Sequence, residues 1–150
     1  MAINPNTDFS SGAVLTAAQQ NRFPRGIMGY TTKTSNFTVT TTTTDVGLSV
    51  TYTAVASRYY KYTFYCFAAD ADANVFTIEV TDSSNVVKYN IRHDADGPTQ
   101  FGFQVLTYIS TESAGSVTRK VRAKTSTGGG VMYADATNVM YLLVEDIGPA

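Results

Sequence analysis

Residues 58–67 read Arg58-Tyr-Tyr-Lys-Tyr-Thr-Phe-Tyr-Cys-Phe67, and the alternation in this stretch decides the fold class. One set of alternate positions holds Tyr60, Tyr62, Phe64 and Cys66, and the other holds Tyr59, Lys61, Thr63, Tyr65 and Phe67. A period of two indicates a β-strand, because successive side chains of a strand point to opposite faces. Both faces carry aromatic rings, so we expect this strand to lie in the core or against another subunit.

The same period of two continues along the chain from residue 27. It predicts strands at 27–33, 36–43, 47–55, 58–68, 74–81, 86–92, 100–110, 116–125, 131–134 and 138–145, separated by Gly, Asp, Asn and Ser turns. Short strands at this spacing, with no long helical pattern between them, are typical of a sandwich or barrel. We therefore predict an all-β fold over residues 27–150, an antiparallel β-sandwich of the jelly-roll type.

The last predicted strand repeats the two-faced pattern of residues 58–67. Val139, Tyr141 and Leu143 alternate with Met140, Leu142 and Val144. An antiparallel sheet commonly leaves one face to water. Two strands without a polar face therefore predict a homo-oligomer, and we assign its contact to Tyr60, Tyr62 and Phe64.

Residues 1–26 form a second predicted unit, an N-terminal arm with one short helix. Thr16 followed by Gln19 fits a capping box, which predicts a helix through residues 17–21. Pro24 and Gly26 then end it.

The composition argues against a nucleic-acid partner. Charged residues make up 15% of the 150 residues and the net charge is −1, whereas nucleic-acid binding needs a basic stripe. Arg119, Lys120, Arg122 and Lys124 form the one local concentration of positive charge. A solvated or edge face of a strand explains it better than a polyanion-binding strip, which is the alternative.

The sequence contains no signal for a membrane or for secretion. Residues 1–8 have neither the basic nor the apolar region of a signal peptide, and no apolar run reaches the length of a membrane span. We expect a soluble protein made in a cytosol, without membrane insertion. Cys66 is the single cysteine, and we expect a buried, unreactive side chain there.

No motif predicts a metal, a cofactor or a catalytic centre. Residues 70–74 resemble the opening of a Ca²⁺ loop, but Val75 and Thr81 stand where the loop needs Gly and Glu. The only histidine, His93, lies in an Asp-rich segment with too few ligands for a metal. We expect turns at both places. The adjacent Glu145 and Asp146 should face opposite sides of a strand, so they cannot act together.

Three segments carry a resemblance to a known group of proteins. They are Gly12–Gly26, Gly47–Tyr62 and Leu143–Pro149, which span nearly the whole chain in order. They resemble small structural proteins of tailed-bacteriophage virions, of the minor tail or head-decoration type. The resemblance implies assembly in the bacterial host cytoplasm, a place in the virion, partners among the capsid or tail proteins, a trimer and an arm that attaches to the particle.

Three classes of function remain. The first, which we favour, is a virion structural protein, and its predicted attachment residues are Phe9, Val14, Leu15, Phe23 and Arg25. The second is a receptor-binding module for a host cell-surface glycan, with Tyr30, Tyr108 and Tyr133 as contacts. The third is a depolymerase that would use Glu79, Glu112, Glu145 and Asp146.

Overall fold

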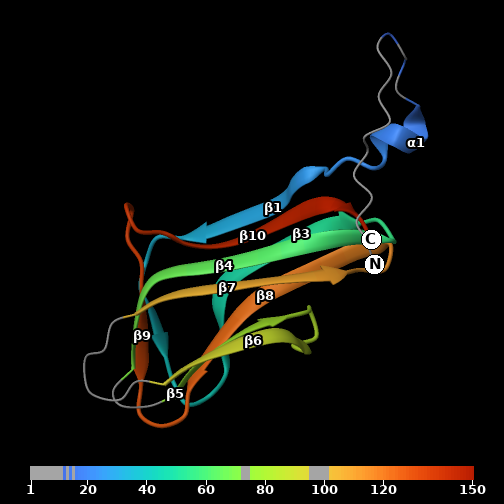
Figure 1. The fold of residues 1–150 in the computed structure, drawn as a ribbon. Helices are drawn as coiled ribbons and strands as arrows, with labels where there is room; N and C mark the ends of the chain where they lie inside the picture. Colours follow the sequence, from blue (N-terminus) through green and yellow to red (C-terminus); the bar gives the residue numbers. More distant parts are fainter. Residues whose placement is uncertain (1–11, 13, 15, 72–74, 95–101) are drawn as a thin grey trace.

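The computed structural model is an antiparallel β-sandwich with one short helix, which confirms the predicted fold class (Figure 1). It describes residues 12, 14, 16–71, 75–94 and 102–150. The elements are α1 (Ala17–Gln20), β1 (Gly26–Lys33), β2 (Phe37–Val39), β3 (Thr44–Ala54), β4 (Arg58–Ala71), β5 (Val75–Thr81), β6 (Val87–Asp94), β7 (Gly102–Thr111), β8 (Gly115–Thr125), β9 (Gly130–Tyr133) and β10 (Met140–Pro149). Every predicted strand thus has a counterpart in the fold.

The strands pair in a nested order. Strand β1 pairs with β10, β3 with β8, β4 with β7, and β5 with β6, all antiparallel. The first half of the chain therefore pairs with the second half in reverse, which is the jelly-roll arrangement. The six-stranded sheet has the order β1-β10-β4-β9-β2 with β7 on β4, and the four-stranded sheet has the order β3-β8-β5-β6.

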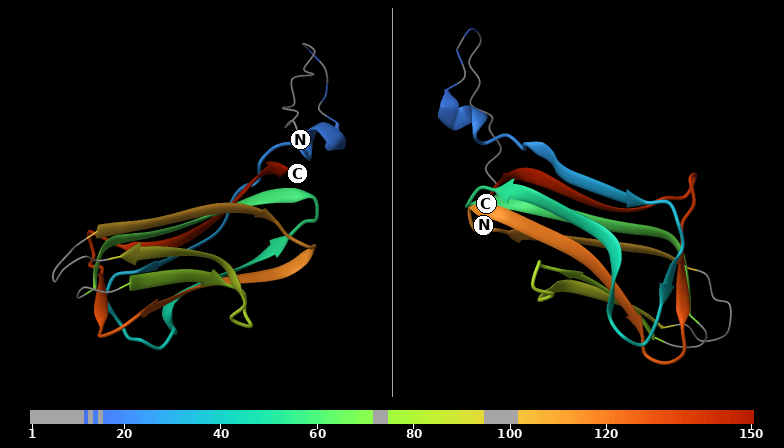
Figure 2. Two further views of the ribbon diagram at one scale, coloured as in Figure 1. Left: turned by 60° about the horizontal axis from the view of Figure 1, so that its bottom comes forward. Right: turned by 180° about the vertical axis from the view of Figure 1, so that it is seen from behind.

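The core lies between the two sheets, which Figure 2 shows as stacked layers. Alternate residues of each strand point inward, as in β3, where Val46, Leu48 and Val50 are buried and their neighbours are exposed. Where β1 passes β3, Gly29 lies directly against Val50, and a side chain there would overlap the valine. A glycine at this position lets the two sheets close on each other.

Three sequence predictions about the strands need correction. The predicted strand 36–43 is only β2, because the threonines after Val39 leave the sheet and β3 starts at Thr44. Strand β10 continues to Pro149 instead of ending at residue 145, with an irregularity between Asp146 and Gly148. Strand β8, which carries the basic residues, lies inside the four-stranded sheet and is not an edge.

Other expectations have mixed outcomes. Cys66 is buried, as predicted. The two Asp-rich segments were expected to be turns, but their described parts are strand: Asp70 lies in β4, and His93 and Asp94 lie in β6. Residues 72–74 and 95–101 lie outside the described residues. Among the residues that the structure describes, no group of three His, Cys, Asp or Glu could hold a metal. No helix in this part of the chain is long and apolar enough to span a membrane.

Candidate attachment site

The N-terminal segment leaves the sandwich at the end where the chain also terminates. Figure 1 shows α1 beyond the edge of the two sheets. Thr16 Oγ1 accepts a hydrogen bond from the Gln19 amide at 3.2 Å, and Gln19 Oε1 accepts one from the Thr16 amide at 2.9 Å. The predicted capping box is therefore present. It satisfies backbone donors of a helix too short to be stable through its own length.

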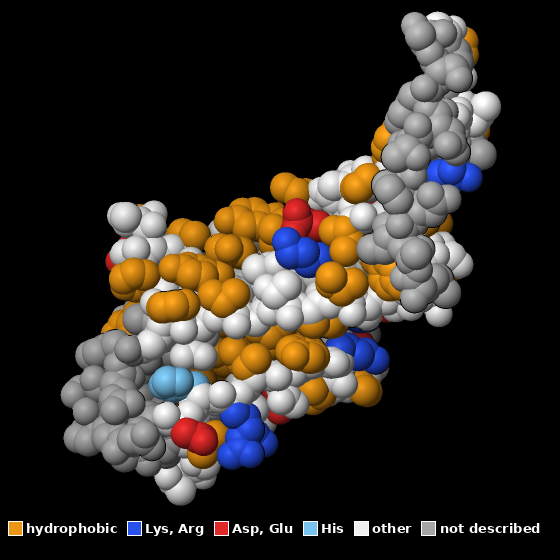
Figure 3. Space-filling view, viewed as in Figure 1, with side chains coloured by type: hydrophobic (Ala, Val, Ile, Leu, Met, Phe, Trp, Pro, Cys, Tyr) orange, Lys and Arg blue, Asp and Glu red, His pale blue; other side chains and the backbone are white. Residues whose placement is uncertain are grey.

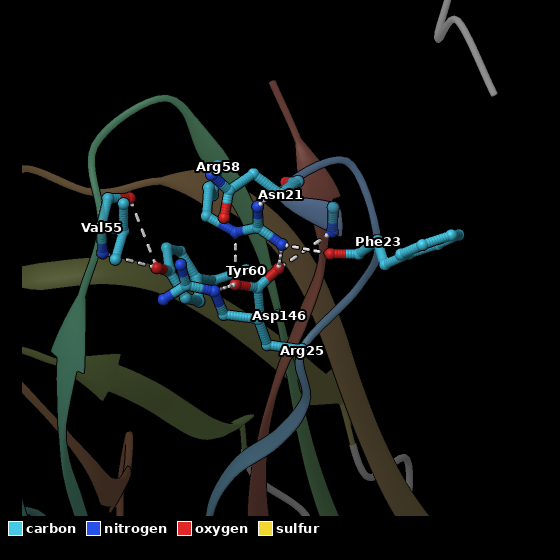
Figure 4. A network of polar contacts seen from close by, with 8 residues as sticks. Asn21, Phe23, Arg25, Val55, Arg58, Tyr60 and Asp146 are labelled. Atoms are coloured by element: carbon cyan, nitrogen blue, oxygen red, sulfur yellow. Dashed lines mark hydrogen bonds and ion pairs between the residues drawn. The ribbon is translucent and has the colours of Figure 1, made fainter. Parts of the chain in front are cut away.

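Arg58, the first residue of β4, ties this segment to the sandwich (Figure 4). Its Nη1 donates to the carbonyl oxygen of Asn21 and its Nη2 to that of Phe23, each at 2.6 Å. These two carbonyls lie just after α1 and just before β1. One guanidinium group thus fixes the path of the chain between the helix and the first strand.

The same guanidinium forms a two-pronged ion pair with Asp146 of β10. Arg58 Nε lies 2.5 Å from Oδ2 of Asp146, and Nη2 lies 2.8 Å from Oδ1. Both side chains are buried, with exposed fractions of 5% and 0%. A guanidinium has a planar fork of donors that fits a carboxylate and carbonyls together, which a lysine could not reproduce.

The C-terminal end of the chain joins the same network. Asp146 Oδ1 also accepts a hydrogen bond from the Gly148 amide at 3.0 Å. Gly148 has a φ of +123°, a conformation that favours glycine, so the bend after Asp146 depends on this residue. The Ala150 amide then donates to the carbonyl of Ser57, one residue before Arg58. All three segments that carry the resemblance therefore meet around Arg58.

The predicted attachment residues differ in where the structure places them. Phe9 and Leu15 lie outside the described residues. Val14 is 90% exposed and Phe23 is 39% exposed, with a ring that Figure 4 shows pointing away from the network. Arg25 Nε lies 4.0 Å from Asp146 Oδ2, and its side chain is 44% exposed. The segment therefore presents apolar and cationic groups to solvent beside its anchor.

Sequence reasoning did not predict that Arg58 and Asp146 form a buried ion pair. Asp146 continues the inward alternation of Met140, Leu142 and Val144, which is the one signal that pointed to a buried carboxylate. Its partner is 88 positions away in the sequence, so no local spacing could show it.

The predicted oligomer contact is on the wrong face of β4. Tyr60, Tyr62 and Phe64 are fully buried between the sheets of one chain. The Tyr60 hydroxyl accepts a hydrogen bond from the Val55 amide at 2.7 Å, which also occupies its polar end (Figure 4). These side chains cannot reach another subunit while the sandwich is closed.

A second buried polar cluster lies where β7 ends and β8 passes. Tyr62 donates to Glu112 Oε1 at 2.6 Å, and Arg119 Nη2 lies 2.5 Å from the same oxygen. Burial raises the pKa of Tyr62 and of Tyr52, whose hydroxyls contact each other, and raises that of Tyr108 to about 12. The phenols therefore stay protonated, and because Tyr62 donates to Glu112, its own hydroxyl oxygen is left to accept from Tyr52. Arg119 belongs to this cluster and not to the outward basic row.

The three tyrosines predicted to bind a glycan do not form one site. Tyr30 is 55% exposed and points outward from β1. Tyr108 points inward from β7 and stacks on Tyr62 with ring centres 4.6 Å apart. Tyr133 lies in β9 and is half-buried.

The carboxylates of the depolymerase hypothesis do not form a common site either, because they have different partners. Glu145 points outward to Lys61 at 3.0 Å, whereas Asp146 points inward to Arg58, as expected for neighbours on a strand. Glu112 is held by Tyr62 and Arg119.

Comparisons with known proteins give a similarity of fold only. Neither a protein-family model nor a curated protein sequence matches this chain. Similar solved structures include the enzymatically active domain of tailspike protein 4 of bacteriophage CBA120, with 16% identity, a TM-score of 0.36, and coverage of 81% of this chain and 19% of that chain. Others are a pentameric capsid protein from metagenomic phage sequences (21% identity, TM-score 0.32, 76% of this chain and 60% of that chain) and a carbohydrate-binding module of Cellvibrio mixtus lichenase 5A (16% identity, TM-score 0.40, 86% and 93%). The chain thus spans less than two thirds of the two phage proteins, and these values are too low to assign a function to it.

Proposed function

We propose that this chain is a non-enzymatic structural protein of a tailed-phage virion that binds other virion proteins through its N-terminal segment. The observation that carries the proposal is the Arg58 network. It holds an exposed segment outside the sandwich in a fixed direction, and it joins the three segments that resemble virion proteins.

The burial of Arg58 and Asp146 supports the proposal, because the residues that hold the N-terminal segment in place are then different from the exposed residues that would contact a partner. Arg58 and Asp146 are inside, so they hold the segment without contacting a partner. Val14, Phe23 and Arg25 are outside and supply apolar area and one cation. Aromatic and Arg side chains at the centre of an interface commonly carry most of its binding energy.

A truncation tests the proposal. Deleting residues 1–20 together with Phe23→Ala and Arg25→Ala removes the arm, α1 and the exposed side chains of Phe23 and Arg25, but keeps the two backbone carbonyls that Arg58 binds. We expect a sandwich with unchanged circular dichroism and unfolding that no longer enters particles. The matched control is Thr53→Ala, a change to an exposed residue of the four-stranded sheet, which should leave incorporation normal. Normal incorporation of the truncated chain would refute attachment through this segment.

The position within the virion follows from copy number. A minor tail or tail-tip protein is present in few copies, whereas a capsid decoration covers the shell. Density of an intact particle that contains the chain would separate these two forms of the proposal.

A glycan-binding function keeps one specific observation in its favour. Tyr30, Tyr141 and Tyr65 form a row on the outside of the six-stranded sheet, with ring centres 5.7 Å and 5.3 Å apart. Such a row could stack on sugar rings. A glycan array on the isolated chain, with Tyr30→Ala as the control, tests it: binding that the substitution abolishes would favour this second function, and an empty array would remove it.

A further inference from the structure

The outside of the six-stranded sheet is apolar. We call it the outer apolar face, and it is formed by outward residues of β1, β10, β4 and β7: Ile27, Tyr30, Tyr65, Phe67, Phe103, Val105, Ile109, Tyr141, Leu143 and Ile147. Phe103 is 72% exposed and Ile27 is 68% exposed. More than half of the exposed large hydrophobic residues in the described part of the chain lie on this face, and Figure 3 shows them gathered over these strands. Monomeric proteins rarely expose a contiguous apolar surface of this kind.

The outward positions of these strands also hold Thr32, Lys61, Thr63, Thr107 and Glu145, but hydrophobic residues outnumber them. Tyr60, Tyr62 and Phe64 fill the core from the inner side of β4, and Leu106 does so from β7. The outward neighbours in the same strands are Tyr65, Phe67, Val105 and Ile109. These outward side chains do not pack in the core of the sandwich. Their apolar surface leaves water only if another surface covers the outer apolar face.

The charges on the face fit a second copy of the same face. Among its described residues, the only charged side chains are Lys61 of β4 and Glu145 of β10, which are neighbours at 3.0 Å. The face has no net charge, so two copies do not repel. In a two-fold contact residue i of one copy meets residue j of the other and the reverse, so an axis that passes close to this pair would bring Lys61 of each chain to Glu145 of the other.

The size of the face is sufficient for a dimer. Four strands spaced about 4.8 Å apart, each contributing about nine residues at about 3.4 Å, cover roughly 19 Å by 30 Å. Two copies together then bury about 1,100 Å², above the roughly 1,000 Å² expected of a specific interface. Sheets packed face to face in this way form an ordinary sandwich contact.

The same features argue against a sugar as the natural occupant. Ile27, Val105 and Ile109 offer no hydrogen bonds, whereas a site for a polar ligand places several polar groups around an apolar base. Leu143 lies opposite Tyr30 and Val105 lies opposite Tyr65, so aliphatic side chains flank the tyrosine row at both ends.

We propose that the outer apolar face binds the same face of a second copy of this chain across a two-fold axis, with Lys61 of each copy against Glu145 of the other. This contact does not depend on the particle role proposed above, and its test uses the isolated full chain. It differs from the trimer that the sequence resemblance implies.

Sedimentation and light scattering of the full chain test the contact. We expect a dimer at micromolar concentration, and Phe103→Lys should convert it to a monomer by weakening association at least about 100-fold, as for a buried aromatic anchor. The matched control Thr51→Lys changes an exposed residue of the four-stranded sheet and should remain dimeric. A monomeric or trimeric wild-type chain, or a Phe103→Lys chain that stays dimeric, would overturn the proposal.

A mixing experiment tests the charge pairing. Lys61→Glu alone and Glu145→Lys alone should each be monomeric, because like charges then face each other across the contact. An equal mixture of the two variants should form a mixed dimer, since each substituted side chain meets its opposite. Folding defects cannot produce this rescue, and failure of the mixture to associate would refute the pairing.

Discussion

Strands β4 and β10 carry two ion pairs, one on each face of the same sheet. Arg58 and Asp146 pair inside the sandwich with exposed fractions of 5% and 0%, whereas Lys61 and Glu145 pair outside with fractions of 39% and 28%. The inner pair adds hydrogen bonds to the carbonyls of Asn21 and Phe23, and the outer pair has only one contact of 3.0 Å. Two ion pairs on the same strands thus have different roles, and the role of each pair depends on how deeply it is buried.

The difference follows from desolvation. A buried charge that loses its partner remains in a medium that solvates it poorly, so each member of the inner pair depends on the other. Water and salt screen the outer pair, which contributes little to the stability of one chain. The inner pair therefore fixes structure, and the outer pair remains available for recognition of another surface.

The largest effect is expected from breaking the inner pair. Asp146→Ala leaves the Arg58 guanidinium buried without its carboxylate, and we expect the free energy of unfolding to fall by about 3–5 kcal/mol. Urea unfolding at pH 7, followed by circular dichroism, measures this change.

The control for that prediction removes both charges. In the double variant Arg58→Met/Asp146→Leu no charge is left unpaired, so it should lose less stability than Asp146→Ala alone. The single variants Arg58→Met and Asp146→Leu complete the cycle: if their losses of unfolding free energy simply add in the double variant, the pair does not act as a unit and the explanation from desolvation fails.

The second largest change in unfolding free energy is expected at the ion pair of Glu112 and Arg119. Their side chains are 13% and 6% exposed, so this pair is less buried than Arg58 and Asp146. Burial alone would raise the pKa of Glu112, but hydrogen bonds from Tyr62 and Arg119 outweigh it and hold the pKa below its ordinary value of 4.5. A carboxyl with a lowered folded-state pKa stabilises the fold above its unfolded pKa and loses this contribution as the pH falls through the folded value.

The measurement is the unfolding free energy between pH 7 and pH 3 for the wild type and Glu112→Gln. At pH 7 the substitution should cost about 1–3 kcal/mol, the value of hydrogen bonds to a charged group. The gap should narrow as the pH drops below 4.5, because the unfolded wild type takes up a proton at Glu112 before the folded state does. Asp82 and Asp135 also have lowered pKa values, but they titrate equally in both proteins and cancel in the difference. A gap that stays constant with pH would show that the charge of Glu112 is not what stabilises the cluster.

The order and type of the strands could be predicted from the sequence because alternation is a local property. Each strand shows its period of two within its own residues, and the capping box of α1 needs only Thr16 and Gln19. The early end of β2 was missed, since threonine fits a strand and a turn equally well and the alternation does not say where the sheet stops.

The direction of a two-faced strand could not be predicted in the same way. In β4 both faces are aromatic, and only the position of the opposite sheet decides that Tyr62 points inward and Tyr65 outward. For the same reason the sequence could not show that Tyr30 points outward and Tyr108 inward, although both were predicted to belong to one glycan site. Pairing between Arg58 and Asp146 depends on the nested strand order, which is a property of the whole chain.

The smallest effects are expected at exposed pairs, and they separate stability from recognition. Lys61→Ala on the six-stranded sheet removes the pair with Glu145, and Lys120→Ala on the four-stranded sheet removes the pair with Asp45 at 3.3 Å and a hydrogen bond to Asn85. Each should change the unfolding free energy of the monomer by no more than about 1 kcal/mol. Both are tested in the Phe103→Lys background, which keeps the chains monomeric.

In the otherwise native chain the two substitutions should differ in self-association. Lys61→Ala should weaken the dimer by about 3–10-fold in Kd, since it removes a charge at the contact, and Lys120→Ala should leave Kd unchanged. The outer side of the four-stranded sheet is polar, with the partly buried Lys120 and Arg122 paired to the exposed Asp45. If Lys120→Ala weakened association as much as Lys61→Ala, the dimer contact would have to include the charged sheet, and the contrast between the two outer faces would no longer explain it.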